Sequence, residues 1–223
     1  MMSTNNPRLV LVDFTARLPD GSVIDTTQSD HSQGIPTQPL RPRLVSLGHP
    51  SFVVVKGLER ALEDAELNVP QTIEVEPKDA YGEWNRKLLR MVTARKLEDP
   101  EKSAVGDEIK INGRTGFIKF MSSGRVQVDY NHRYAGKKIR YDFTVTDLLD
   151  ADKAKVEAIL EEAGFGDEPN YQLDEGSLEI SIPNDMLKDE KFQNRIFQLH
   201  MNIFRFVSDL KDIRFTIEFT APA

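Results

Sequence analysis

The stretch from Val128 to Val145, VDYNHRYAGKKIRYDFTV, joins a tight polar turn to a strand in which apolar and polar residues alternate. Strict alternation places one face of a strand against a core and the other toward water. The runs LVLVDF (9–14) and TIEVE (72–76) show the same kind of β pattern, and turn-forming residues follow both. The sequence therefore predicts sheet strands separated by turns and loops.

Apolar residues recur at helical spacing in three other segments. Residues 58–65 predict a short helix after Gly57, and a capped helix is expected over residues 151–163, before Gly164. Alternating strands at residues 178–182 and 213–219 enclose a third, longer helix, so the tail is expected to be a β-α-β unit. The apolar stripe of that helix consists of Phe192, Ile196, Leu199, Ile203, Phe206 and Leu210.

Two segments between these elements have a different composition. Residues 28–50 are dense in Ser, Gln, Gly, Pro and His, which predicts a long surface loop. Residues 88–121 alternate short strand-like runs (LLRMV, DEIKI, FIKFM) with NG and SG turns, a pattern typical of a small all-β module. The chain as a whole is therefore expected to be of the α+β class, with an all-β piece in its middle.

Charge and composition narrow the classes of partner. The net charge is −7 and the pI is near 5.2, which argues against a nucleic-acid surface because phosphate binding needs clustered Lys and Arg. The chain contains no cysteine, which excludes disulfides, thiolate metal sites and a Cys nucleophile. The opening MMSTNNPR is too polar for a signal peptide, and no apolar run approaches the roughly 20 residues of a membrane span. We therefore expect a cytoplasmic protein.

Conventional catalytic motifs are not evident. The four histidines, His31, His49, His132 and His200, show no metal-ligand spacing such as HExxH. The two-glycine turn GRTGF (113–117) lacks the Lys-Ser/Thr of a phosphate loop, and no GxSxG nucleophile elbow occurs. We therefore predict no metal and no cofactor, and any enzyme activity must depend on binding and on the environment of a pocket.

Three segments occur in an order that resembles the FKBP family of peptidyl-prolyl cis/trans isomerases: DFTARLPDGSVIDTT (13–27), VVVKGLERALEDAELNVPQTIEVEPKDAYGEW (53–84) and VDYNHRYAGKKIRYDFTV (128–145). The resemblance is strongest to the SlyD-like and long archaeal FKBPs, which carry an insert-in-flap chaperone domain between the AYG motif and an NHPLAG motif. It implies an α+β fold in which an antiparallel sheet wraps a short helix.

The same resemblance implies a division of the chain into domains. Residues 1–85 and 131–150 would form the isomerase domain, and residues 86–130 would form the all-β insert. Residues 151–223 would be a C-terminal α+β domain, which serves dimerisation in the long archaeal members. The partners implied are unfolded or partly folded polypeptides with X-Pro bonds, and a second copy of the chain through residues 151–223.

The resemblance also implies the site. Catalysis would involve Phe14, Asp25, Val55, Leu58, Tyr81 and Tyr141, and Ile24 and Val54 would complete the proline pocket. The Val55 amide and the Tyr81 hydroxyl would bind substrate carbonyls, and Leu58 would form the floor, where small FKBPs have tryptophan. In the return motif Arg133 and Tyr134 replace Pro-Leu, and NVPQ stands at 68–71 in place of a VGD turn. Without the order of the motifs, plain core packing would be the favoured interpretation of Phe14, Val55, Leu58 and Tyr141.

Apolar residues of the insert allow two interpretations. They could all build its core, or some could form an exposed groove that captures unfolded chains, in which methionine adapts to varied sequences. The substrate-binding candidates are Leu88, Met91, Phe117, Phe120 and Met121. The apolar stripe of residues 192–210 also allows two interpretations: it could pack within its own unit, or it could form the interface of a dimer. For the whole chain the alternative to an isomerase is a holdase-type chaperone or binding module on a catalytically weak FKBP fold.

Overall fold

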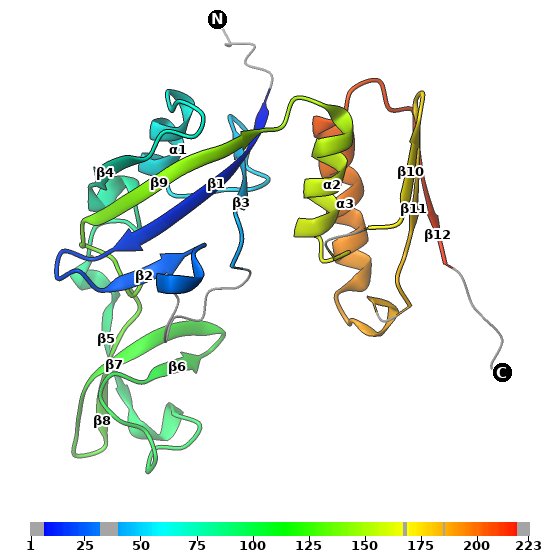
Figure 1. The fold of residues 1–223 in the computed structure, drawn as a ribbon. Coiled ribbons are helices and arrows are strands. Elements are labelled where there is room, and N and C mark those ends of the chain that lie inside the picture. The colour runs from blue at the N-terminus through cyan, green and yellow to red at the C-terminus, as the bar shows by residue number, and fades with distance from the viewer. Residues whose placement is uncertain (1–6, 32–39, 167–168, 185, 218–223) are drawn as a thin grey trace, which may run out of the picture.

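The structure is a computed structural model that describes residues 7–31, 40–166, 169–184 and 186–217. The described residues contain three sheets and the α-helices α1 (Lys56–Glu63), α2 (Asp152–Glu162) and α3 (Phe192–Phe206), which confirms the α+β class (Figure 1). Short 3-10 turns occur at Ser29–His31, Pro77–Asp79, Arg86–Leu88, Ala94–Lys96 and Met186–Lys188. Within these residues, no helix combines the length and the apolar character needed to cross a membrane.

The main sheet is built around two long antiparallel strands, β1 (Arg8–Arg17) and β9 (Ile139–Leu148). Its order is β2-β1-β9-β4, and β3 also pairs with β1. The other strands are β2 (Val23–Thr26), β3 (Arg43–Leu47) and β4 (Gln71–Val75). One face of this sheet packs on Leu58 and Leu62 of α1. The short amphipathic helix thus closes a core against the alternating strands.

Strand β3 corrects the expectation of a continuous loop over residues 28–50. It pairs with β1 from Arg8↔Leu47 to Val12↔Arg43, and its last four residues are buried. The run is only five residues long and is preceded by prolines, so its β character is hidden by the surrounding polar composition. Residues 32–39 lie outside the described residues.

A second sheet is inserted between β4 and β9. Its strands are β5 (Leu89–Thr93), β6 (Glu108–Ile111), β7 (Arg114–Ser122) and β8 (Arg125–Asp129), in the order β5-β8-β7-β6. All pairs are antiparallel, and a separate core lies on one face. This sheet lies beside β2 and the start of β9 and extends away from the main sheet (Figure 1).

The chain enters and leaves the insert through two adjacent segments that Asn131 joins. The buried Asn131 side chain accepts from the Asn85 amide (2.9 Å) and donates to the Asn85 carbonyl (3.0 Å) and to Asp129 (2.6 Å). Trp84 Nε1 donates to the same Asp129 carboxylate at 3.1 Å. Burial acts to raise the pKa of Asp129, but the hydrogen bonds from Asn131 and Trp84 outweigh it and the pKa is lowered. This cluster of hydrogen bonds holds the two crossing segments together.

The C-terminal unit combines α2 and α3 with β10 (Tyr171–Asp174), β11 (Ser177–Ser181) and β12 (Asp212–Thr216). Strands β11 and β12 are parallel, and β10 adds an antiparallel edge that the sequence analysis missed. The β-α-β expectation was therefore incomplete. Helix α3 ends at Phe206, so Leu210 lies beyond it, and residues 218–219 of the expected last strand lie outside the described residues.

The apolar stripe of α3 belongs to a core. Each of its six residues packs in one cluster with α2 and the strands of this unit. Of the two interpretations of this stripe, the structure shows packing within its own unit. A different face of α3 is exposed, at Phe197 (56%), Met201 (48%) and Phe204 (45%).

The C-terminal core is shared with the main sheet, because Leu9 of β1 and Leu44 of β3 are buried in the same cluster as α2 and α3. Helices α2 and α3 lie between the main sheet and the sheet of the C-terminal unit (Figure 1). The ring of Phe206 lies 5.7 Å from that of His49 and 6.1 Å from that of Phe52. The two units are therefore packed against each other rather than connected by a free linker.

Candidate functional site

A cavity of about 380 Å³ opens beside the start of α1, between β1, β2, β3 and β9. Its lining includes every residue predicted to take part in catalysis, and also Val54. The full set of lining residues is Phe14, Asp25, Arg43, Val53, Val54, Val55, Lys56, Leu58, Ala80, Tyr81 and Tyr141. The structure thus brings together residues that lie up to 127 positions apart in the chain. Ile24 packs against the same core but is not part of the lining.

The apolar walls follow from the local structure. Val53, Val54 and Val55 form an extended segment that leads into α1, and the Val55 carbonyl accepts the first helical hydrogen bond from Glu59. Leu58, on the first turn of α1, is fully buried. On the sheet, the ring centroids of Phe14 and Tyr141 lie 5.9 Å apart. Val53 is the exposed lip of this wall, with 66% of its surface accessible.

The carboxylate of Asp25, in the cavity wall, is paired with Arg43. The guanidinium of Arg43 donates to both carboxylate oxygens of Asp25, at 2.8 and 3.1 Å. The same guanidinium lies 4.7 Å from the centroid of the Phe14 ring. A carboxylate beside apolar positions requires such a partner, and a paired arginine can also stack on an aromatic face. Arg43 therefore fixes both Asp25 and one wall of the cavity.

Sequence analysis did not find Arg43 because it lies in the segment that was predicted to be loop. The available signal was indirect. A carboxylate at Asp25 among apolar pocket residues implied a cation somewhere in the fold, but 29 Lys and Arg residues offered no way to choose among them.

Two tyrosines supply the hydroxyl groups of the cavity. Burial raises the pKa of Tyr81, and burial together with the neighbouring Tyr81 phenol raises the pKa of Tyr141 far above its ordinary value. Both groups are therefore neutral phenols that can donate hydrogen bonds at any physiological pH. The cavity offers a weakly solvated, mostly apolar space with neutral donors.

Tyr81 belongs to a cluster of three rings. Its ring is stacked on His132, with centroids 4.4 Å apart and planes 5° from parallel, and it lies 5.4 Å from Tyr134. Burial and the nearby charge of Arg133 lower the pKa of His132, so the imidazole is neutral at pH 7. The return loop thus places two rings against the outer side of the cavity wall.

The substrate-binding candidates of the insert fall into different places. Register places Met91 and Phe120 opposite the same residue, Gln127 of β8, on the face of the sheet away from its core. Phe117 lies on that face too, opposite Asp129. Met91 and Phe120 are 53% and 52% exposed. The structure therefore gives the insert sheet an uncovered apolar face, which we call the outer face.

Two of those candidates are not on the outer face. Met121 is half-buried and packs against the insert core, together with Val92 and Ile118, on the face opposite to Met91 and Phe120. Leu88 is half-buried in the 3-10 turn before β5. The division of apolar residues between core and outer face could not be read from the sequence, because a bulge between Ile118 and Phe120 shifts the alternation.

Among the described residues, no group of three or more His, Asp or Glu side chains is placed to hold a metal ion. The acidic side chain of the cavity, Asp25, is already engaged by two hydrogen bonds from Arg43.

Comparison with known proteins finds relatives that cover about two thirds of this chain. No protein-family model matches the chain. The "FKBP-type 16 kDa peptidyl-prolyl cis-trans isomerase" of Escherichia coli (strain K12) is 27% identical over 151 residues, which is 66% of this chain and 94% of that protein. The SlyD isomerase of Haemophilus influenzae is 26% identical over 162 residues, 71% of this chain and 75% of its own.

An archaeal protein shows the same relationship. The "Short-type peptidyl-prolyl cis-trans isomerase" of Methanocaldococcus jannaschii is 24% identical over 148 residues, or 64% of this chain and 92% of that protein. Matches of this extent, to bacterial and archaeal proteins alike, agree with the motif order and with the cavity. The chain is a homologue of the FKBP-type peptidyl-prolyl cis-trans isomerases, SlyD and the short-type archaeal enzyme included.

Proposed function

We propose that this protein accelerates cis/trans isomerisation of X-Pro bonds in unfolded polypeptides, and that the cavity at Tyr81 and Leu58 is its active site. The observation that carries the proposal is the composition of the cavity. Aliphatic and aromatic walls surround neutral hydroxyl donors and one fully paired carboxylate. The reaction requires no acid, base or nucleophile, and the carboxylate of the cavity is held by Arg43.

Rotation about an X-Pro bond crosses a barrier of roughly 18–20 kcal/mol because amide resonance is lost in the twisted state. The twisted amide has less charge separation than the planar one, so a weakly solvated cavity favours it relative to water. Only interactions that are stronger with the twisted form accelerate the reaction, and each tenfold in rate requires about 1.4 kcal/mol. A few contacts that are stronger with the twisted amide are therefore sufficient for a large acceleration.

In this mechanism the proline ring lies against Leu58, Phe14 and Tyr141. The Val55 amide and the Tyr81 hydroxyl hold the substrate carbonyls on either side of the rotating bond, as the family resemblance implies. The Asp25–Arg43 pair keeps its carboxylate at a constant position without bringing a free charge to the proline. The three valines before α1 and the buried floor at Leu58 exclude water from the ring.

We further infer that residues 86–130 act as a chaperone domain whose outer face captures unfolded chain. Met91 and Phe120 support this role because they are large, apolar, exposed and side by side across β8. Methionine adapts to varied sequences, which suits a surface that binds many clients. The isomerase domain would then comprise residues 1–85 and 131–150. On this proposal the protein acts in the cytoplasm, where nascent and unfolded chains occur.

The test is refolding of a model protein whose slow step is a prolyl isomerisation. We expect the full chain to accelerate refolding strongly, and a version with Met91→Ser and Phe120→Ser to accelerate it much less while isomerising a short X-Pro peptide at an undiminished rate. Thr93→Ser, an exposed change on the same sheet, is the matched control. No acceleration of either substrate by the full chain would contradict the proposal.

The alternative is a holdase on a catalytically weak FKBP fold, favoured by Leu58 at the floor position and Ile24 outside the cavity lining. It predicts suppressed aggregation in the same assay without faster refolding. Dimerisation through residues 151–223 is a separate proposal. The exposed α3 face of Phe197, Met201 and Phe204 is the surface that would carry it. Light scattering of the full chain and of Met201→Glu would test it.

A further inference from the structure

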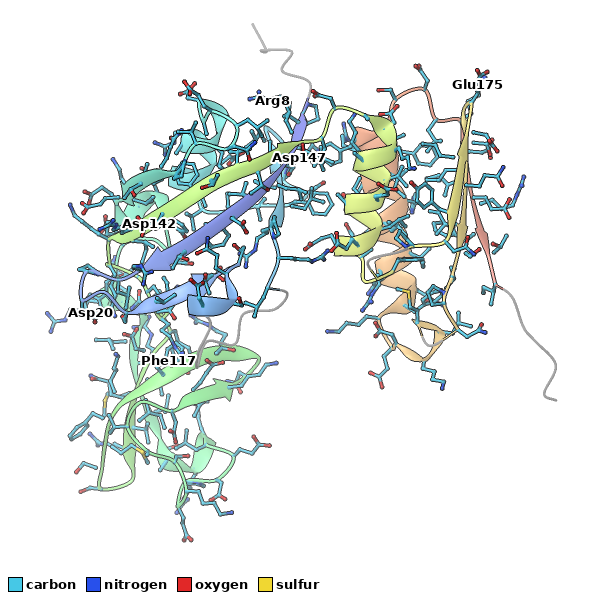
Figure 2. The ribbon with its side chains drawn as sticks, in the orientation of Figure 1. Arg8, Asp20, Phe117, Asp142, Asp147 and Glu175 are labelled. Carbon is cyan, nitrogen blue, oxygen red and sulfur yellow. The ribbon has the colours of Figure 1, made fainter. Side chains whose placement is uncertain are left out.

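A second cavity lies where the insert sheet meets the return loop. We call it the junction groove; its volume is about 540 Å³, within the range of about 300–1,000 Å³ typical of ligand clefts. Four rings line it, those of Phe117, Tyr130, His132 and Tyr134. Phe117 lies at the end of the insert that faces the main sheet (Figure 2).

Two arginines lie over rings of the groove, and one of them, Arg133, also lines it. The Arg133 guanidinium lies 4.9 Å from the Phe117 ring centroid, and the Arg114 guanidinium lies 4.7 Å from that of Tyr130. Arg133 also contacts the Glu108 carboxylate at 3.6 Å. These contacts are of the cation–π type, in which the negative face of an aromatic ring attracts the cation. They favour the observed orientation of the two rings.

The junction groove and the proline cavity share a wall. Tyr81 lines the cavity, and His132 and Tyr134 line the groove, with centroids 4.4 and 5.4 Å from Tyr81. The wall is therefore about one ring thick. An extended chain advances about 3.3–3.6 Å per residue, so a polypeptide with its proline in the cavity reaches the groove two to four residues away.

We propose that the junction groove is a subsite for an aromatic side chain of the substrate, two to four residues from the proline. Aromatic rings attract one another in tilted and offset arrangements beyond the effect of area alone, and this groove presents four of them. A Lys or Arg side chain would meet the charges of Arg133 and Arg114. An Asp or Glu side chain would compete with Glu108, which already occupies Arg133.

This inference rests on the proposed isomerase function and deepens it. It gives the insert a role in selecting which prolines are isomerised, because Phe117 and Tyr130 come from the insert while Tyr81 belongs to the catalytic cavity. The outer face with Met91 and Phe120 continues along β7 to Phe117. On this proposal a captured chain contacts apolar side chains of the outer face, of the junction groove and of the cavity.

The experiment uses the full chain and short X-Pro peptides that carry Phe or Ala at two, three or four positions before or after the proline. We expect one Phe position to raise kcat/KM at least about fivefold over its Ala counterpart. Phe117→Ala should abolish that preference, so that the Phe and Ala peptides are isomerised with equal kcat/KM. Phe117 lies outside the insert core, so its removal should not unfold the sheet.

Two further variants complete the design. Arg133→Gln removes the guanidinium from the Phe117 ring and should reduce the preference, whereas Val105→Ala, an exposed change in the insert, should not alter it. A wild-type protein that is active but shows no preference, or a preference that persists in Phe117→Ala, would overturn the subsite. A wild-type protein that isomerises none of the peptides would instead overturn the proposed function.

Discussion

The hydroxyl of Ser51 donates a hydrogen bond of 2.8 Å to the side-chain oxygen of Asn202 on α3. Two residues after Ser51 the chain forms the Val53–Val55 wall of the cavity. His49 Nδ1 also contacts the Ser51 hydroxyl, at 2.9 Å, and His49 packs edge-on against Phe206. The C-terminal unit therefore braces the segment that forms one wall of the proposed active-site cavity.

Loss of this brace should affect substrate binding. We expect Asn202→Leu to raise KM for a short X-Pro peptide about 3–10-fold with little change in kcat, because the wall is displaced while its residues are retained. Asn202→Asp keeps an oxygen acceptor for Ser51 and should preserve KM. Peptide isomerisation kinetics measure both, and equal KM values for the two variants would contradict a positioning role.

The Asp25–Arg43 pair gives a second prediction. Arg43→Met leaves a half-buried carboxylate without its two hydrogen bonds and removes the cation from the Phe14 ring. We expect kcat/KM to fall about tenfold and the free energy of unfolding to fall by about 1–3 kcal/mol. Arg43→Lys retains the charge without the bidentate geometry and should recover part of the loss. Urea unfolding and peptide kinetics provide the measurements, and an Asp25→Asn, Arg43→Met double variant tests the coupling.

His132 makes stability depend on pH. Its pKa in the folded protein is lowered, whereas an unfolded chain has a histidine pKa of about 6.5. The unfolded state therefore takes up the proton first. The stabilisation associated with the neutral stacked ring is complete above about pH 6.5 and is lost as the pH falls from there toward the lower folded pKa.

We expect the free energy of unfolding to be smaller at pH 5.5 than at pH 7.5, and the decrease to be smaller in His132→Phe, which keeps a ring on Tyr81 without a titrating group. Burial also lowers the pKa of His49, so His49 contributes to the decrease in stability at low pH in both proteins. Urea titrations at the two pH values provide the comparison. Identical decreases in wild type and variant would show that His132 is not involved.

Asn131 gives a prediction about the junction itself. Its amide satisfies the Asn85 backbone N–H and C=O and contacts Asp129, all close to the point where the insert begins. Asn131→Ala leaves the part-buried Asn85 N–H and C=O without this partner, at a cost of about 1–3 kcal/mol for each group that water cannot reach, whereas Asp129 keeps its hydrogen bond from Trp84. We expect the Asn85 amide to exchange hydrogen much faster, while amides in the middle of β1 and β9 keep their protection. Unchanged exchange at Asn85 would argue against this role.

Much of this protein was predictable from the order of its residues. The α+β class, the short helix at residues 56–63 and the long helix that starts at Phe192 follow from local periodicity, which each segment carries within itself. The residues of the proline cavity were predicted from motifs that stand in a fixed order, and the structure places seven of the eight around one space.

The tertiary structure decided what depends on partners distant in sequence. Strand β3 exists because β1 offers it a buried edge, Arg43 became a site residue because Asp25 faces it, and the bulge in β7 directed Met121 inward and Phe120 outward. In the same way, α2 and the strands of the C-terminal unit cover the apolar stripe of α3, whereas Phe197 and Met201 stay exposed. Sequence determines which faces are apolar, but only packing determines which of them are covered, because burial is a property of pairs of surfaces.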